Sequence, residues 1–243
     1  MNVELISHTG YPDPWHAADV MIFTKQTRLK LTPNLFNEIK NWPTEKKLEE
    51  LNYMAQTVPS SWEFADFTFL IEGVTRAFTH QLVRTRTASY AQQAMRVVNM
   101  EGWEYMTGPT IQKNELARNI YDECMGDIDD AYKALLDLGI PAEDARGLLP
   151  TNIFTNIVMK NNLRGMADLI RKRSSSRVQG EYRDVLKAMK QAMLDAQPWV
   201  HIFIETDFNR AAYNLDVFVQ SLGLQKEQEN NLIKQIDIMR NQC

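Results

Sequence analysis

The segment F-T-H-Q-L-V-R-T-R-T-A-S-Y-A-Q-Q-A-M-R, residues 78–96, contains three arginines and no acidic side chain. Arg84, Arg86 and Arg96 each offer a planar fork of donors that stays charged at physiological pH and matches phosphate or carboxylate geometry. The segment therefore suits an anion. A solvated basic surface is the alternative, and these residues alone leave the two interpretations evenly balanced.

The residues before this segment predict a strand that leads into a helix. Apolar and polar residues alternate over 64–72, which favours a strand, and we expect Gly73 to end it. Helical spacing then places Arg76, His80 and Arg84 on one face. That face would carry positive charge directly into residues 78–96.

Hydrophobic periodicity predicts the elements on both sides of this unit. Period-two alternation favours strands over 2–8, 151–160 and around Trp103–Met106. Three- and four-residue spacing favours helices, and we expect the longest, 111–137, to belong to the core. The other expected helices are 15–24, 33–41, one capped by Thr44, 142–147, 162–173, 177–196 (capped by Ser176 with Gln179), 208–221 and 225–240. These patterns indicate an α+β fold in which long helices wrap a small mixed or antiparallel sheet.

Length and composition suit a folded globular protein. We expect its 243 residues to form a single domain, 1–243, with a helical C-terminal extension at about 207–243. The net charge of −4 argues against broad nucleic-acid binding. Two cysteines imply no disulfide framework and favour a reducing compartment. With neither a leader nor a membrane-spanning run in the sequence, we expect a cytoplasmic protein without a membrane partner, in the host cytoplasm if it is viral.

The sequence lacks the common motifs for metal and phosphate binding. Its histidines and cysteines have no paired-ligand spacing, so we expect no metal site. It has no P-loop, no G-x-G-x-x-G and no nucleophile elbow, so side chains must hold any phosphate. The available donors form a first cluster, Gln81, Arg84, Arg86 and Arg96, and a second, Asn162, Arg164, Arg171, Lys172, Arg173, Arg177 and Gln179, with Arg146 between them. Two such clusters suit two phosphorylated molecules held side by side.

Residues 79–96, with R-T-R at 84–86, resemble the signature of the flavin-dependent thymidylate synthases (ThyX family), written R-H-R followed by seven residues and a serine. Upstream, S-S-W-E-F-A-D-F-T-F-L-I-E-G-V-T-R resembles the strand-to-helix entry of that family. Downstream, A-R-G-L-L-P, N-L-R and K-R-S-S-S-R-V-Q-G-E match A-R-x-x-L-P, N-x-R and L-R-x-x-S-H-A-Q-x-E at similar separations. The resemblance covers about residues 56–183.

The resemblance implies a ThyX-like homotetramer with active sites at subunit interfaces. Each site would hold FAD, a pyrimidine deoxynucleotide monophosphate and a folate. The implied reaction transfers a one-carbon unit from methylenetetrahydrofolate to C5 of dUMP, with hydride from reduced flavin and NADPH as the reductant of the flavin. No enzyme nucleophile attacks the pyrimidine in this family, which fits the motifs absent here.

The resemblance also implies roles for individual residues. The implied flavin contacts are Ser60, Arg84, Thr85, Arg86, Gln92, Asn162, Arg164 and Asp168. The implied nucleotide contacts are Gln81, Arg84, Gln92, Ala94, Met95, Arg96, Arg146 and Arg173. Arg173 is the implied catalytic residue, because a guanidinium beside the pyrimidine would stabilise the negative charge that develops there.

The chain departs from the family pattern around the implied substrate. The departures are Thr85 for histidine, Gln92 for glutamate, Ala94 for serine, Val97 for tyrosine, Phe64 for histidine, Asp168 for asparagine and Arg177 for histidine. Losing the serine hydroxyl would cost about 1 to 3 kcal/mol if its partner stays buried. Two other hypotheses therefore stay open. One is a variant, for example viral, that uses another pyrimidine nucleotide or leaves a hydroxymethyl group; the other is a non-catalytic nucleotide- or nucleic-acid-binding module.

Overall fold

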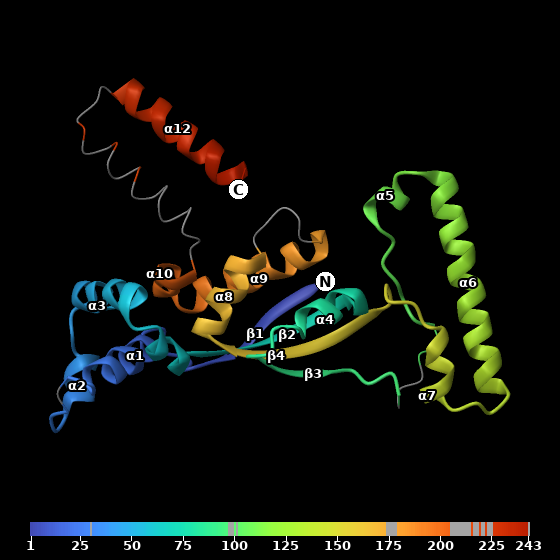
Figure 1. Ribbon diagram of the computed structural model, residues 1–243, viewed down its shortest axis with the longest axis horizontal. Coiled ribbons are helices and arrows are strands. Elements are labelled where there is room, and N and C mark those ends of the chain that lie inside the picture. Colours follow the sequence, from blue (N-terminus) through green and yellow to red (C-terminus); the bar gives the residue numbers. More distant parts are fainter. Residues whose placement is uncertain are drawn as a thin grey trace. The chain divides into compact units, whose positions relative to one another are not determined.

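The computed structural model describes residues 1–29, 31–96, 100, 102–173, 179–204, 215, 219, 222 and 226–242. In this part of the chain, a four-stranded sheet has the strand order β1-β2-β4-β3 and is accompanied by helices (Figure 1). The strands are β1 (Asn2–His8), β2 (Asp66–Thr75), β3 (Ser89–Gln92) and β4 (Phe154–Asn162). The predicted α+β class is confirmed.

Helices occupy most of the remaining described chain. Before the third strand lie α1 (His16–Gln26), α2 (Leu35–Lys40), α3 (Thr44–Thr57), the 3₁₀ helix η1 (Pro59–Phe64) and α4 (Arg76–Leu82). After it lie α5 (Pro109–Gln112), α6 (Glu115–Asp137), α7 (Ala142–Ala145), η2 (Arg146–Leu148), α8 (Leu163–Arg173), α9 (Gly180–Ala196), η3 (Pro198–Val200), α10 (His201–Ile204) and α12 (Lys226–Gln242). The expected helix 208–221 lies largely outside the described residues.

The chain divides into two compact units. The first comprises Met1–Glu4 and Phe69–Lys160, and the second comprises Leu5–Thr68 and Asn161–Cys243. Strands β1, β2 and β4 contribute residues to both. A single domain over 1–243 stays a prediction.

In the first unit, β4 confirms the predicted alternation. Ile153, Thr155, Ile157 and Met159 are all buried, as period-two geometry requires of one face. Strand β3 runs antiparallel to β4, with Ser89 opposite Lys160 and Gln92 opposite Ile157. This register fixes where the arginine-rich segment leaves the sheet.

The connection from β2 to α4 differs from the prediction. Gly73 has a φ of 62° but does not end the strand, because glycine tolerates this conformation and lets β2 continue to Thr75. The Thr75 hydroxyl accepts a hydrogen bond from the backbone N–H of Phe78 at 3.0 Å and so caps α4. Helix α4 ends at Leu82. Arg84 therefore lies beyond the helix, and the expected three-residue basic face is wrong at this position.

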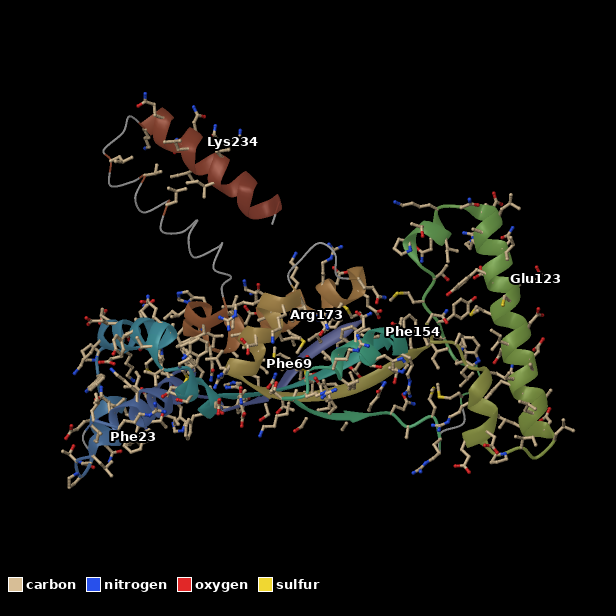
Figure 2. The ribbon with its side chains drawn as sticks, in the orientation of Figure 1. Phe23, Phe69, Glu123, Phe154, Arg173 and Lys234 are labelled. Atoms are coloured by element: carbon tan, nitrogen blue, oxygen red, sulfur yellow. The ribbon has the colours of Figure 1, made fainter. Side chains whose placement is uncertain are left out.

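Helix α6 is the longest described helix, but the prediction that it belongs to the core is wrong for most of its length. Of its residues only Met125 and Tyr132 are buried. Leu116 and Ile120 are 74% and 66% exposed, and Glu123 also lies on the exposed surface (Figure 2). An amphipathic pattern shows that a helix has an apolar face, not that the same chain covers it.

Three smaller expectations also need correction. The strand around Trp103–Met106 is reduced to a single bridge between Tyr105 and Ile153. The N-cap of α3 is Pro43, and Thr44 is the first helical residue. Helix α9 begins at Gly180 with no side-chain cap from Gln179. Ser176, the expected partner in that cap, lies outside the described residues.

Aromatic side chains form much of the core of the second unit. The ring centres of Trp62 and Phe203 are 4.9 Å apart, and those of Trp199 and Phe203 are 6.0 Å apart. The Trp199 indole N–H donates to the carbonyl of Pro14 at 2.7 Å, and the Trp62 indole N–H donates to Met54 at 3.1 Å. Each buried indole N–H thus has a hydrogen-bond acceptor, so the two tryptophan rings can pack in the core without an unpaired donor.

Candidate functional site

The predicted site residues fall into two sets, one in each compact unit. The first unit contains Gln81, Arg84, Thr85, Arg86, Gln92, Ala94, Met95, Arg96 and Arg146. The second contains Ser60, Asn162, Arg164, Asp168 and Arg173.

The turn between α4 and β3 presents the first two arginines. The Tyr90 hydroxyl lies 2.9 Å from the carbonyl oxygen of Leu82 and 3.0 Å from that of Thr85, so it ties the turn to β3. Arg84 and Arg86 are exposed, and in the described part of the chain neither pairs with a carboxylate. The turn therefore offers two uncompensated guanidinium groups on a fixed backbone.

Gln92 joins β3 to α4 and β4. Its amide nitrogen donates to the hydroxyl of Thr79 at 2.9 Å and to that of Thr155 at 3.5 Å. The Thr79 hydroxyl in turn donates to the carbonyl of Arg76 at 3.1 Å. An ionised glutamate could not donate to these buried hydroxyls, so this network gives a structural reason for glutamine at this position.

Arg76 is a further candidate site residue, to which the sequence analysis gave a place on a basic face and in the family-like strand-to-helix entry but no binding role. Its guanidinium donates to the carbonyl of Gln93 at 2.6 Å, where the Gln93–Arg96 segment begins. Burial lowers the pKa of Arg76, and the positive charge of Arg146 lowers that pKa further. Within the described chain, neither arginine pairs with a carboxylate, and Arg76 Nε is buried without a partner. Two like charges near each other favour an anion between them.

Most of the remaining first-unit residues lie at the surface. Ala94, Arg96 and Arg146 are exposed, while Met95 and Gln81 are half-buried. The Nε of Arg146 donates to the carbonyl of Glu143 at 3.0 Å, which leaves its terminal nitrogens for other partners.

In the second unit, Asn162 caps α8. Its side-chain oxygen accepts a hydrogen bond from the Gly165 N–H at 2.9 Å, which leaves its amide nitrogen as a donor. The neighbouring Asn161 is buried and packs against Gly165, where a Cβ would lie 2.3 Å from the Asn161 side-chain oxygen. Glycine is therefore required for this close approach.

Helix α8 is attached to η1 beside this cap. The Leu163 N–H donates to the carbonyl of Ala65 at 2.8 Å. Arg164 pairs with Glu63 at 2.6 Å, and both side chains are about half exposed. This exposed ion pair places the Arg164 guanidinium beside η1.

Ser60 and Asp168 lie on the same two elements. Ser60 precedes Glu63 by one 3₁₀ turn, and Asp168 follows Arg164 by one α-helical turn, so each shares a face with a member of that ion pair. The Ser60 hydroxyl accepts from Arg28 and the Asp168 carboxylate accepts from Arg171, both at 2.6 Å. The fold thus brings four of the predicted residues, Ser60, Asn162, Arg164 and Asp168, to η1 and the first half of α8.

Arg173 lies at the other end of α8 (Figure 2). Its guanidinium carbon is 5.3 Å from the centre of the Tyr182 ring, a cation–π geometry that restrains this half-buried side chain. Arg173 also lines a cavity of about 270 Å³ between α8 and α9.

Comparison with known proteins identifies the family. Residues 4–199 match the family model described as thymidylate synthase complementing protein. The chain belongs to this family. The predicted family resemblance is confirmed over a longer region than the motifs cover.

Relatives of this family member are named flavin-dependent thymidylate synthase. The protein from Sulfurisphaera tokodaii is 32% identical over 208 residues, 82% of this chain and 75% of the relative. The Geobacter sulfurreducens protein is 38% identical over 140 residues, 57% of this chain and 60% of the relative. The Nitratidesulfovibrio vulgaris protein is 41% identical over 135 residues, 52% of this chain and 55% of the relative. The chain therefore spans less than two thirds of the last two proteins.

Among the described residues, no group of three or more histidine, cysteine, aspartate or glutamate side chains is placed to hold a metal ion. No described helix is both long and apolar enough to cross a bilayer.

Proposed function

We propose that this chain is a flavin-dependent thymidylate synthase of the cytoplasm. It would transfer a one-carbon unit from methylenetetrahydrofolate to C5 of dUMP, and would use NADPH as the final reductant. The observation that carries the proposal is the family match over residues 4–199, which includes every predicted site residue. Restrained arginines in both units support it.

The residues present fit FAD. Arg84 and Arg86 carry positive charge that no carboxylate of the described chain offsets, and the Tyr90 hydroxyl holds their turn in place. Two such guanidinium groups suit the pyrophosphate of a dinucleotide. The free amide nitrogen of Asn162 and the guanidinium of Arg164 supply further donors at the start of α8. Ser60, Thr85, Gln92 and Asp168 complete the proposed flavin contacts. When bound, reduced flavin supplies the hydride that completes the methyl group.

The proposed nucleotide contacts surround the segment that follows β3. Arg96 and Arg146 would hold the phosphate, and Arg76 adds a guanidinium bonded to that segment. Ala94 and Met95 can contribute only backbone donors, because neither side chain carries one. Gln81, Arg84 and Gln92 complete the proposed set.

Arg173 is the proposed catalytic residue. Its guanidinium would lie against the pyrimidine and stabilise the negative charge that develops on the ring during one-carbon transfer. The Tyr182 ring holds the guanidinium before substrate arrives, so little reorganisation is needed. We expect Arg173→Ala to lower kcat by roughly 100-fold or more, as loss of one preorganised electrostatic contact does in other enzymes. Arg118→Ala, on the exposed surface of α6, is the matched control.

The test combines flavin binding with product analysis. Purified protein is titrated with FAD and then incubated with methylenetetrahydrofolate, NADPH and either dUMP or dCMP. We expect a yellow complex and, by mass spectrometry, thymidylate from dUMP. A hydroxymethyl product, or methylation of dCMP instead, would show a changed reaction. Protein that never binds FAD would refute the proposal. Wild-type protein that forms no product, with nucleotide binding that survives Arg173→Ala, would indicate a non-catalytic module.

We also propose a homotetramer whose active sites draw residues from more than one subunit. Co-expression of differently tagged Arg86→Ala and Arg173→Ala chains tests this. If the two sets of residues meet across subunits, some sites in mixed tetramers are intact, and activity returns to about a quarter of normal or more. Activity no greater than that of either variant alone would place both sets in one subunit.

A further inference from the structure

The cavity between α8 and α9 is strongly basic. Its lining consists of Ile170 and Arg173 from α8 and Arg183, Leu186, Lys187 and Lys190 from α9. Four of these six side chains are cationic, and no acidic residue is among them. Only Arg173 belongs to the proposed catalytic site, so the other three cations have no role in it.

The cations on α9 form one stripe. Arg183, Lys187 and Lys190 are spaced i, i+4 and i+7, which places them on the same face of a helix. Seven residues correspond to about 10 Å along a helix axis. Asp184 lies about 100° around the helix from Arg183 and does not line the cavity. The positive charge therefore extends along α9 without an acidic residue among the lining side chains.

The cavity beside this stripe has an apolar base. Ile170 and Leu186 are buried at its base. In the described part of the chain, Lys187 and Lys190 pair with no carboxylate, and Lys190 is half-buried. Like charges gathered at a concave, partly apolar surface attract anions more strongly than scattered surface lysines do. The cavity has the character of a binding site for a flexible anionic chain.

We infer that this cavity binds the glutamate carboxylates of the folate co-substrate. The inference rests on the proposed function, because Arg173 would then contact the pyrimidine at one end of the cavity. The one-carbon donor must bring its reactive end to C5 of that pyrimidine, and its anionic glutamate tail is at its opposite end. Each added γ-linked glutamate brings one more carboxylate, which a linear row of cations can pair in turn.

The size of the cavity favours a tail over a whole ligand. Pockets that enclose a drug-sized molecule measure about 300 to 1,000 Å³. A cavity of about 270 Å³ is too small for a complete folate or dinucleotide but accommodates one or two glutamates. The phosphates of FAD and dUMP have proposed contacts elsewhere, so the phosphates of NADPH are the competing anionic groups for this cavity, and the experiment separates them from folate.

The test compares two folates on two proteins. Wild type and the Lys187→Gln/Lys190→Gln variant are assayed with methylenetetrahydrofolate carrying one or three glutamates. For wild type, we expect the KM for the triglutamate to be roughly three- to tenfold lower than the KM for the monoglutamate, since each exposed ion pair changes affinity a few-fold. This preference should disappear in the variant and at high salt, with kcat and the KM for dUMP unchanged. Lys113→Gln/Lys226→Gln removes the same charge elsewhere and should keep the preference.

A binding measurement keeps this inference separate from the proposed reaction. Calorimetry with tetrahydrofolate mono- and triglutamate on the FAD-loaded protein needs no turnover. If no thymidylate forms but the lysine-dependent preference for the triglutamate remains, the cavity assignment stands while the proposed reaction fails. A preference that survives the lysine substitutions overturns the inference. A variant that loses affinity for NADPH but keeps the folate preference also overturns it.

Discussion

Gln92 illustrates how one residue serves the fold and the proposed site at once. Both donors of its amide nitrogen face buried threonine hydroxyls, Thr79 and Thr155, and only its oxygen is left for a ligand. The position is therefore constrained by its neighbours inside the first unit as well as by chemistry.

We expect Gln92→Glu to destabilise the protein by about 1 to 3 kcal/mol at neutral pH. A carboxylate cannot donate to the two hydroxyls and would be partly desolvated beside them. Urea unfolding measures the change. Gln93→Glu is the matched control, since the Gln93 side chain is exposed. Equal stability of the two variants would mean that the hydrogen bonds of Gln92 contribute little.

The Asp19–Lys47 ion pair makes a second residue-scale prediction. Both side chains are buried in the second unit, with 2.6 Å between Asp19 Oδ1 and Lys47 Nζ. Burial raises the pKa of Asp19, while Lys47 partly opposes this. Removing one partner leaves a buried charge, so we expect Lys47→Met to cost about 3 to 5 kcal/mol. The double variant Asp19→Leu/Lys47→Met should recover most of that loss in denaturant unfolding.

The pH dependence of this pair has a definite sign. Because the folded-state pKa of Asp19 is raised, folded Asp19 holds its proton to higher pH than unfolded Asp19 does. Its contribution to stability is greatest below the unfolded pKa of 3.8 and falls as pH rises through the folded value. Relative to Asp19→Asn, wild type should therefore lose stability as pH rises from about 4 toward neutrality. A constant difference over that range would contradict the raised pKa.

At the scale of elements, α8 depends on a close approach that only glycine permits. In an exposed helix interior, glycine to alanine stabilises by about 1 kcal/mol. At Gly165 the new methyl group would collide with the buried Asn161 side chain and disturb the Asn162 cap. At this position, replacing glycine with alanine should therefore destabilise the protein instead of stabilising it.

We expect Gly165→Ala to lower the melting temperature and to weaken FAD binding several-fold. Gly126→Ala on α6 is the matched control, because nothing lies within 4 Å of the added Cβ. That variant should be neutral or slightly stabilised, with unchanged FAD affinity. Thermal unfolding and flavin fluorescence measure both effects. Stabilisation by Gly165→Ala would show that Asn161 moves aside at little cost.

At the scale of the whole molecule, the family match ends at residue 199, but the core of the second unit continues to Ile204. Phe203 packs on Trp62 and Trp199 in that core. Val219 and Ile236, farther along the chain, form a small cluster of their own. Among the residues that the structure describes, the last ones in the aromatic core around Trp62 and Trp199 therefore belong to α10.

We expect a chain that stops after Ile204 to keep the melting temperature, FAD affinity and turnover of the full chain. A chain that stops after Gln197 should not fold, because it lacks Trp199 and Phe203. Loss of each large buried aromatic costs about 3 to 5 kcal/mol, against a total stability of about 5 to 15 kcal/mol. Differential scanning fluorimetry separates the two. A folded shorter chain would place these rings outside the essential core.

Features that depend on neighbours along the chain were predictable from the order of the amino acids. Alternate residues of a strand face the same side, so the shared burial of Ile153, Thr155, Ile157 and Met159 was predictable. The family was also recognisable, because several ordered blocks kept their spacing. The roles of the individual site residues stay proposals.

The contacts between residues far apart in the chain depend on the folded structure and were not predictable from local patterns. Gln92 donates to Thr155, Arg76 lies near Arg146, and Arg173 shares a cavity with Lys190, yet none of these pairs leaves a periodic signal. The exposed face of α6 is a further case, because an amphipathic pattern does not say what covers it. Local periodicity reports the geometry of one element, whereas hydrogen bonds, shared charge and cavities arise from packing between elements far apart in the chain.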